Sequence, residues 1–210
     1  MEFIQINRIF CFILSIFFLI GCVIARPMKN DRMGLLDRLR TLEEANINIP
    51  KEEPQLSSSV LSQVKAMTYQ WQWPVRPVVI TSLFGKRGSD YHEGVDLRAK
   101  RGSIVYAVSD GEVIYAGVSI KGYGKMLVIE HGGVGGNALS TVYAHNSRLV
   151  VKKGQKVKKG QQIAYSGSTG HSVGSHLHFE IRHGVIALDP IKILPEHPNW
   201  ASQVIATRKK

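Results

Sequence analysis

The sequence predicts an all-β protein whose main part is a compact antiparallel domain, sandwich-like or barrel-like in form. From residue 78 onward, short β-prone runs alternate with turn residues, and no helix of usual length fits between them. At 210 residues, the chain is long enough for one domain of ordinary size plus appendages. Before the domain we expect a signal segment and a partly helical tether.

The N-terminal region predicts export. The apolar run Ile9–Ile20 has the length of a signal-peptide core rather than that of a comfortable membrane span. It ends in Leu-Ile-Gly-Cys at residues 19–22, which looks like a bacterial lipobox. Residues 1–21 are therefore expected to be a lipoprotein signal peptide, with Cys22 carrying a lipid that attaches the protein to a membrane. Cleavage after Ala25 and an uncleaved anchor are the two alternatives, and basic residues after the run weaken the usual charge bias.

Residues 22–71 are interpreted as a tether with little core of its own. Two stretches within it, Leu35–Ala45 and Ser57–Tyr69, have apolar residues at helical spacing, and Pro50 and Pro54 separate them. Two short amphipathic segments that lie on the main domain or are partly disordered are favoured over a separate domain.

The main domain begins near Trp71 and Trp73, and its strands follow in order. Asp110-Gly111 is flanked by β-prone runs at 104–109 and 112–118, a pattern typical of a two-residue hairpin. Further strands are predicted at residues 125–131, 139–145, 161–166 and 176–183.

A six-residue near-repeat lies between the last predicted strands. Lys-Lys-Gly-Gln-Lys-Val at 152–157 is followed directly by Lys-Lys-Gly-Gln-Gln-Ile at 158–163. Glycine at the third position suits a tight turn that needs a positive φ. We interpret the repeat as two adjacent turns, with a basic patch for anionic wall polymer as the secondary interpretation.

The charge balance predicts attraction to polyanions without identifying one. Lys and Arg number 27 against 16 Asp and Glu, which leaves a formal charge of +11 and a pI near 9.8. The basic residues are dispersed apart from 148–159 and the tail at 196–210. Because no nucleic-acid-binding motif accompanies them, we expect no nucleic-acid partner.

Five residues form the pattern of a mononuclear zinc hydrolase. A catalytic zinc needs three nitrogen or oxygen ligands and one open position for water. The His92-x-x-x-Asp96 pair and one histidine of His176-Leu177-His178 supply that number. Residues two apart on a strand share a face, so His176 and His178 can enter one cavity together. The remaining histidine of that pair and His145 are left for proton transfer.

The other candidate residues receive structural interpretations. Glu93 follows a histidine as in H-E-x-x-H enzymes, but the second histidine of that motif is absent, so Glu93 is interpreted as solvated or as a support behind the ligands. His131, near a strand end, is expected to make a structural hydrogen bond. His171 is expected to border the site within a glycine-rich loop, and His183 and His197 are assigned no function.

Several motifs in order resemble one known family closely. They are Ser82-Leu-Phe-Gly-Lys-Arg87, His92-x-Gly-x-Asp96, Ala107-Val-x-Asp-Gly111, Tyr123-Gly124, Ile129-Glu-His-Gly132, Tyr143-Ala-His145, Gly167-x-Thr-Gly170 and His176-Leu-His-Phe-Glu180. Over residues 72–195 they resemble the lysostaphin-type, or LytM-like, peptidoglycan metalloendopeptidases.

The resemblance implies more than the spacing does. It implies an antiparallel β fold with a groove, one Zn²⁺ held by His92, Asp96 and His178, and His145 and His176 as the catalytic histidines that do not bind the metal. The implied substrate is the peptide part of peptidoglycan.

The expected function is therefore zinc-dependent cleavage of stem or crosslink peptides during wall remodelling or division. The alternatives are an envelope factor of the same fold that binds the wall or activates another hydrolase, and a carrier-type β domain. We expect an exported, membrane-anchored lipoprotein. Val23 after Cys22 favours the outer membrane, facing the periplasm.

Overall fold

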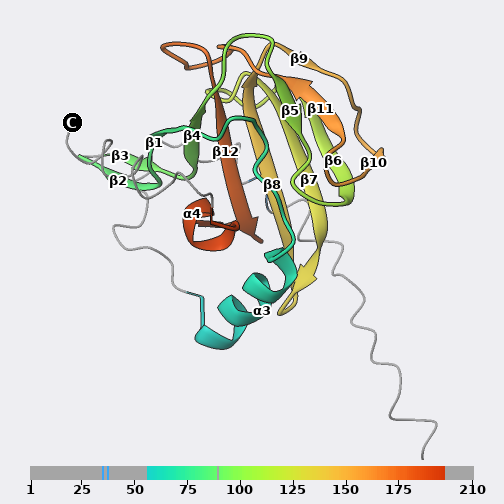
Figure 1. Ribbon diagram of the computed structural model, residues 1–210. Helices are drawn as coiled ribbons and strands as arrows, with labels where there is room; N and C mark the ends of the chain where they lie inside the picture. The colour runs from blue at the N-terminus through green and yellow to red at the C-terminus, as the bar shows by residue number, and fades with distance from the viewer. Residues whose placement is uncertain (1–34, 36, 38–55, 89, 197–210) are drawn as a thin grey trace, which may run out of the picture.

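One long antiparallel sheet organises the domain. The computed structural model describes residues 35, 37, 56–88 and 90–196, and Figure 1 shows the arrangement. The strand order is β1 (Ile80–Ser82), β4 (Val95–Arg98), β12 (His176–His183), β8 (Asn137–Asn146), β7 (Lys125–Val134), β6 (Gly111–Gly117) and β10 (Lys156–Val157), with β13 (Ile186–Leu188) paired to β12. Among the described residues, the first and last strands of this order do not pair. The antiparallel all-β prediction is confirmed, and the sheet is open rather than a closed barrel.

A smaller sheet packs against the larger one. It consists of β5 (Ile104–Tyr106), β11 (Gln162–Tyr165) and β9 (Arg148–Leu149), all antiparallel. Val105 and Ile163 of this sheet share one buried cluster with Leu127 and Phe179 of the main sheet. The two layers therefore form a sandwich. A separate two-stranded ribbon, β2 (Gly85–Arg87) with β3 (Asp90–His92), precedes the main sheet strand β4.

The main sheet is apolar on both faces. A second buried cluster contains Ile114, Met126, Val128 and Val142, which alternate along their strands with residues of the first cluster. Leu35 joins this second cluster and is only 2% exposed. Leu35 and Asp37 are helical, in agreement with the first predicted helical stretch, and the remainder of that stretch lies outside the described residues.

The second predicted helical stretch is confirmed as α3 (Ser58–Thr68). The Ser57 hydroxyl caps it by accepting a hydrogen bond from the Val60 amide. Val64 is fully buried in the main core, and the Thr68 hydroxyl lies 3.3 Å from the carbonyl of Ile193 in α4 (Pro190–Ile193). This segment thus lies on the domain.

The predicted hairpin at Asp110-Gly111 is wrong. Strand β5 pairs with β11 in the small sheet, whereas β6 pairs with β7 and β10 in the main sheet, so the two flanking strands do not pair with each other. Asp110 instead contacts the turn between β10 and β11, because its carboxylate accepts hydrogen bonds from Lys158 Nζ and the Lys159 amide. Gly111 is required by close approach, since a Cβ there would lie 2.5 Å from the Glu130 carbonyl.

The near-repeat forms two similar turns, as predicted. Gly154 and Gly160 have φ values of 86° and 78°. In each turn a glutamine side chain accepts a hydrogen bond from the lysine amide three residues earlier: Gln155 from Lys152 and Gln161 from Lys158. The first turn bonds to Val113 of the main sheet, while the second bonds to Ala107, just after β5. One turn is therefore hydrogen-bonded to the main sheet, and the other to the segment that follows the first strand of the small sheet.

Several predicted segments lie outside the described residues: the signal segment with Cys22 and Ala25, most of the tether, and the tail beyond residue 196, which includes His197. Within the part of the chain that the structure describes, no helix has the length and apolar character needed to cross a membrane.

Candidate active site

Two adjacent strands bring the predicted metal ligands together. His178 of β12 is the register partner of Asp96 of β4, so their side chains leave neighbouring positions of the main sheet. His92 ends β3 and returns to the same point through a turn at Gly94. A Cβ on Gly94 would lie 2.4 Å from the Phe179 carbonyl, so only glycine allows this turn to pack against β12.

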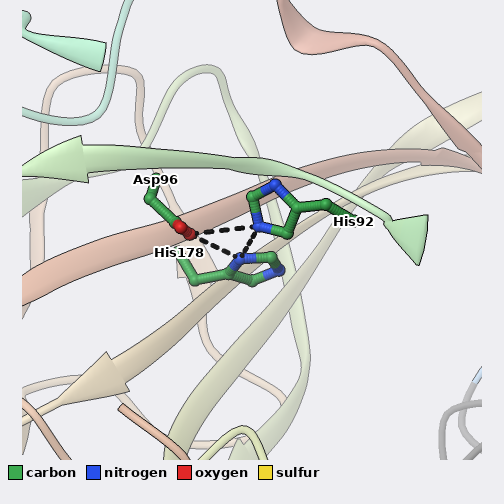
Figure 2. Close-up of side chains that lie close together, drawn as sticks. All are labelled: His92, Asp96 and His178. Atoms are coloured by element: carbon green, nitrogen blue, oxygen red, sulfur yellow. Dashed lines mark hydrogen bonds and ion pairs between the residues drawn. The ribbon is translucent and has the colours of Figure 1, made fainter. Parts of the chain in front are cut away.

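The three side chains converge on one point (Figure 2). His92 Nε2 lies 3.1 Å from Asp96 Oδ1, His178 Nδ1 lies 3.0 Å from Asp96 Oδ1, and the two nitrogens lie 3.0 Å apart. Tetrahedral bonds of the length typical for Zn²⁺ place ligand atoms about 3.3 Å apart. This nearly equilateral triangle of two nitrogens and one oxygen fits a single metal ion. Among the described residues, these three side chains are the His, Cys, Asp or Glu group placed to hold a metal.

Hydrogen bonds behind the two histidines leave a lone pair facing the triangle. His92 Nδ1 lies 2.7 Å from the Leu83 carbonyl, which can only accept, and it is also contacted by the Arg87 guanidinium. A hydrogen donated from Nδ1 to Leu83 leaves the lone pair on Nε2. His178 Nε2 lies 2.9 Å from Glu180 Oε1, so a hydrogen held there leaves Nδ1, 3.0 Å from Asp96 Oδ1, as the nitrogen that a metal would take. A metal ion satisfies both lone pairs and the carboxylate at once.

The charges around the triangle also favour a cation. Burial opposes ionisation of Asp96, yet hydrogen bonds with His178 and His92 hold its pKa far below the usual range. Burial lowers the pKa of His178, but the hydrogen bonds to Asp96 and Glu180 outweigh it and raise that pKa to about 9. The site therefore attracts positive charge to the Nδ1 position of His178. A ligand set of two nitrogens and one carboxylate suits Zn²⁺ better than Mg²⁺ or Ca²⁺.

His145 and His176 lie beside the triangle without joining it. Their ring centroids are 4.8 Å apart, and the His145 ring is 5.8 Å from that of His178. His145 Nδ1 lies 2.8 Å from the Thr169 carbonyl, and His176 Nδ1 lies 2.8 Å from the Gly174 carbonyl. In each ring a backbone carbonyl thus contacts Nδ1, and Nε2 of His176 lies 3.7 Å from Asp96 Oδ1.

The backbone holds His145 in an unusual conformation. Its φ is 61°, which makes it the non-glycine residue with a positive φ in the described chain. Its amide donates to the Tyr123 carbonyl at 2.9 Å, and its own carbonyl accepts from the Thr169 amide at 3.4 Å. Burial, together with the nearby His178 and His176, lowers the pKa of His145 to about 4. The imidazole is therefore neutral at neutral pH and can accept a proton.

All five predicted residues line one groove of about 520 Å³. Its remaining walls include Tyr91, Tyr123, His171 and Val173, and Val173 is fully exposed. Arg87 stands at the rim, 3.3 Å from Asp96 Oδ2, and also contacts Ser82 and His92. The groove therefore holds the metal triangle and the two further histidines in one cavity.

Comparisons with known proteins agree with this geometry. The model of peptidase family M23 matches residues 90–190. The catalytic domain of EnpA, a prophage-encoded M23 protein from Enterococcus faecalis solved as a point mutant, is 34% identical. The match covers 60% of this chain and 95% of that domain, with a TM-score of 0.50. This chain belongs to peptidase family M23.

Other relatives of this M23 chain differ in their described roles. A zinc-containing peptidase from Vibrio cholerae is 35% identical over 62% of this chain and 41% of that one, with a TM-score of 0.53. The murein hydrolase activator NlpD of Salmonella dublin is 37% identical over 69% of this chain and 36% of its own length. The M23 chain thus spans about a third of the length of this curated relative.

The M23 site contains a buried charge network that the sequence reasoning missed. Glu180 and Arg182 of β12 are fully buried, and Arg182 forms an ion pair with Glu93 at 2.5 Å. Glu93 therefore supports the site from behind, as one of its two predicted interpretations stated. The signal was available in His-x-His-x-Glu-x-Arg, whose alternation places four polar residues on one strand face.

The remaining histidines of the M23 domain keep structural positions. His131 bridges the Asp110 carbonyl and the Thr141 hydroxyl at 2.7 and 2.8 Å, as predicted, and burial lowers its pKa to about 4. His183 is buried and lies 2.7 Å from the Val134 carbonyl. His171 is exposed and borders the groove, in agreement with its prediction.

Proposed function

We propose that this M23 chain is a zinc-dependent endopeptidase that hydrolyses peptide bonds in peptidoglycan stem or crosslink peptides, in wall remodelling or division. The observation that carries the proposal is the completeness of the site: three converging ligand atoms and two further histidines in one groove. The sequence and structural similarity to EnpA and to the zinc-containing peptidase supports the same assignment.

The proposed ligands are His92, Asp96 and His178, holding one Zn²⁺ per domain. When bound, such an ion polarises the scissile carbonyl and acidifies water. His145 has a neutral ring whose Nδ1 contacts a backbone carbonyl, so it suits the uptake of a proton from the attacking water. His176 presents its Nε2 to the same groove and suits oxyanion stabilisation or protonation of the leaving amine. The contacts of the two rings do not decide which histidine takes the proton from water and which one stabilises the oxyanion or protonates the amine.

The test uses purified peptidoglycan with defined crosslinks, with and without a chelator. The unaltered protein should release crosslink or stem fragments, and the chelator should abolish release. His145→Ala and His176→Ala should each retain zinc and lose roughly 10²–10⁴ of the rate. Lys65→Ala, an exposed residue of α3 that does not line the groove, is the control and should remain active. Full activity in either alanine variant removes that histidine from the mechanism, and zinc loss moves it into the ligand set.

A second candidate is a non-catalytic envelope factor that binds the wall or activates another hydrolase. The name of the NlpD relative, a murein hydrolase activator, favours it. This candidate predicts no fragment release by the protein alone and stimulation of a purified wall hydrolase that persists in chelator. The two assays use the same preparation, so their outcomes separate the candidates directly.

We further propose an exported protein anchored through a lipid on Cys22, in the outer membrane and facing the periplasm. Two named lipoproteins support it: YgeR of Escherichia coli and a Pseudomonas aeruginosa NlpD/LppB homologue, 39% and 41% identical. A clickable fatty acid should label the unaltered protein and not Cys22→Ser. An unlabelled protein whose mature N-terminus is Arg26 contradicts the anchor and indicates cleavage after Ala25.

A further inference from the structure

Strand β12 continues a polar row past the proposed ligand into the protein interior. His176, His178, Glu180 and Arg182 alternate along it, while Leu177 and Phe179 face the apolar core. Glu180 and Arg182 are both fully buried. Charged side chains are almost never fully buried unless each is paired, so Glu180 and Arg182 are expected to have specific partners.

The Glu180 carboxylate divides its two oxygens between different partners. Oε1 accepts hydrogen bonds from His178 Nε2 at 2.9 Å and from the Tyr123 hydroxyl at 2.8 Å. Oε2 accepts from Arg182 Nε at 2.5 Å. Both ring nitrogens of His178 face a carboxylate oxygen, Nε2 that of Glu180 and Nδ1 that of Asp96 at 3.0 Å. A metal in the triangle would displace the hydrogen on Nδ1, and the hydrogen that remains is the one Nε2 donates to Glu180. The lone pair is then on Nδ1, the atom that faces Asp96 and His92.

The rest of the row prevents Glu180 from turning away. Arg182 is fixed by Glu93 Oε2 at 2.5 Å and by the Val185 carbonyl at 3.1 Å. Rotation of the Glu180 side chain would therefore break charge-assisted hydrogen bonds between fully buried groups. Arg182 and Glu93 hold the carboxylate, and the carboxylate holds the imidazole.

We propose that Glu180 is the positioning residue of the metal site: it fixes the His178 ring in the orientation and tautomer that direct Nδ1 at the metal, with Arg182 and Glu93 as its support. The inference rests on the proposed zinc function. A ring carrying its hydrogen on Nδ1 has no lone pair there and cannot serve as the third ligand.

The test compares Glu180→Gln with the unaltered protein. The glutamine amide has one NH₂ group, which must face either Arg182 or His178. Facing Arg182, it places two donors against each other. Facing His178, it donates to Nε2, so the ring hydrogen is favoured on Nδ1. The dissociation constant for zinc, measured by competition with a chelating dye, should rise about 10- to 100-fold. In the zinc-bound protein, where the His178 ring carries one hydrogen, long-range ¹H–¹⁵N spectra should show the Nε2–H signal of the unaltered protein shifted or lost in Glu180→Gln.

Control variants separate positioning from stability. Glu93→Gln weakens the support while keeping both Glu180 contacts, so it should change zinc affinity less than Glu180→Gln does. Glu180→Asp keeps a charge beside Arg182 and withdraws the carboxylate from His178, so it should also weaken zinc binding. Urea unfolding of each metal-free variant reports stability independently.

The outcomes are distinct. Zinc binding by Glu180→Gln or Glu180→Asp as tight as in the unaltered protein, with the Nε2–H form retained, overturns the inference. Loss of folding in both metal-free variants also overturns it and assigns the row to stability alone. Failure of the unaltered protein to bind zinc instead contradicts the proposed function on which the inference rests.

Discussion

Zinc binding should expel a proton from His178. In the metal-free site the pKa of this histidine is raised to about 9, because hydrogen bonds to Asp96 and Glu180 outweigh burial. The Nδ1 atom that would hold the proton lies 3.0 Å from Asp96 Oδ1 and 3.0 Å from His92 Nε2, which is the position of the proposed metal. Proton and metal therefore compete for one lone pair.

The magnitude and sign follow from that competition. At pH 7.5, a group with a pKa near 9 is protonated in more than about nine tenths of the molecules, so about one proton should leave for each zinc bound. Raising the pH removes the competitor, so zinc affinity should strengthen by about tenfold per pH unit, or about 1.4 kcal/mol, until the pH approaches the His178 pKa. Ionisation of a water on the metal adds to the count, which makes one proton the lower limit.

Titration calorimetry checks this count. Zinc is titrated at pH 7.5 in buffers with different ionisation enthalpies, and the slope of observed enthalpy against buffer enthalpy gives the number of protons released. His171→Gln is the matched control, because it removes an exposed groove histidine outside the triangle and should leave the count unchanged. Zinc binding with no proton release, or with an affinity that does not change between pH 7 and 8, would refute the reasoning.

Three further changes probe the site and its frame. Asp96→Ala removes the anionic ligand, so zinc content measured by elemental analysis should fall sharply; stoichiometric zinc would count against this ligand. Gly94→Ala places a Cβ 2.4 Å from the Phe179 carbonyl, so urea unfolding should show a loss of about 1–3 kcal/mol, and an unchanged midpoint would contradict the close packing. Val64→Ala empties a fully buried position of α3 and should cost about 1–3 kcal/mol, whereas the exposed Lys65→Ala should cost little; equal effects would show that α3 does not pack on the core.

The sequence predicted the parts of the site that depend on local spacing. His176 and His178 share a strand face because side chains alternate with a period of two, and the strand has the predicted bounds 176–183. The convergence of His92 on that strand could not be derived from spacing, because it depends on the pairing of β4 with β12 and on the close approach at Gly94. The family resemblance supplied that long-range information instead.

The hairpin error has the same origin. Asp-Gly between two β-prone runs is a local signal, and it says nothing about which strand each run pairs with. The partners of β5 and β6 lie in different sheets, and the Asp110 carboxylate is used by two lysines nearly fifty residues away. A turn residue with a tertiary partner cannot be distinguished from a hairpin residue by its neighbours alone.

The buried row behind His178 bears on the choice between a hydrolase and an activator. A buried ion pair such as Glu180 with Arg182 costs desolvation, and apolar residues of similar volume are often as stabilising or more so. Stability therefore gives no reason for a fully buried arginine between two carboxylates. The need to hold one imidazole in one orientation gives such a reason, because the row contacts the proposed ligand His178 directly, and Tyr123 beside it. A surface that only binds a partner has no use for that device, so the row supports the proposal that this chain binds a metal.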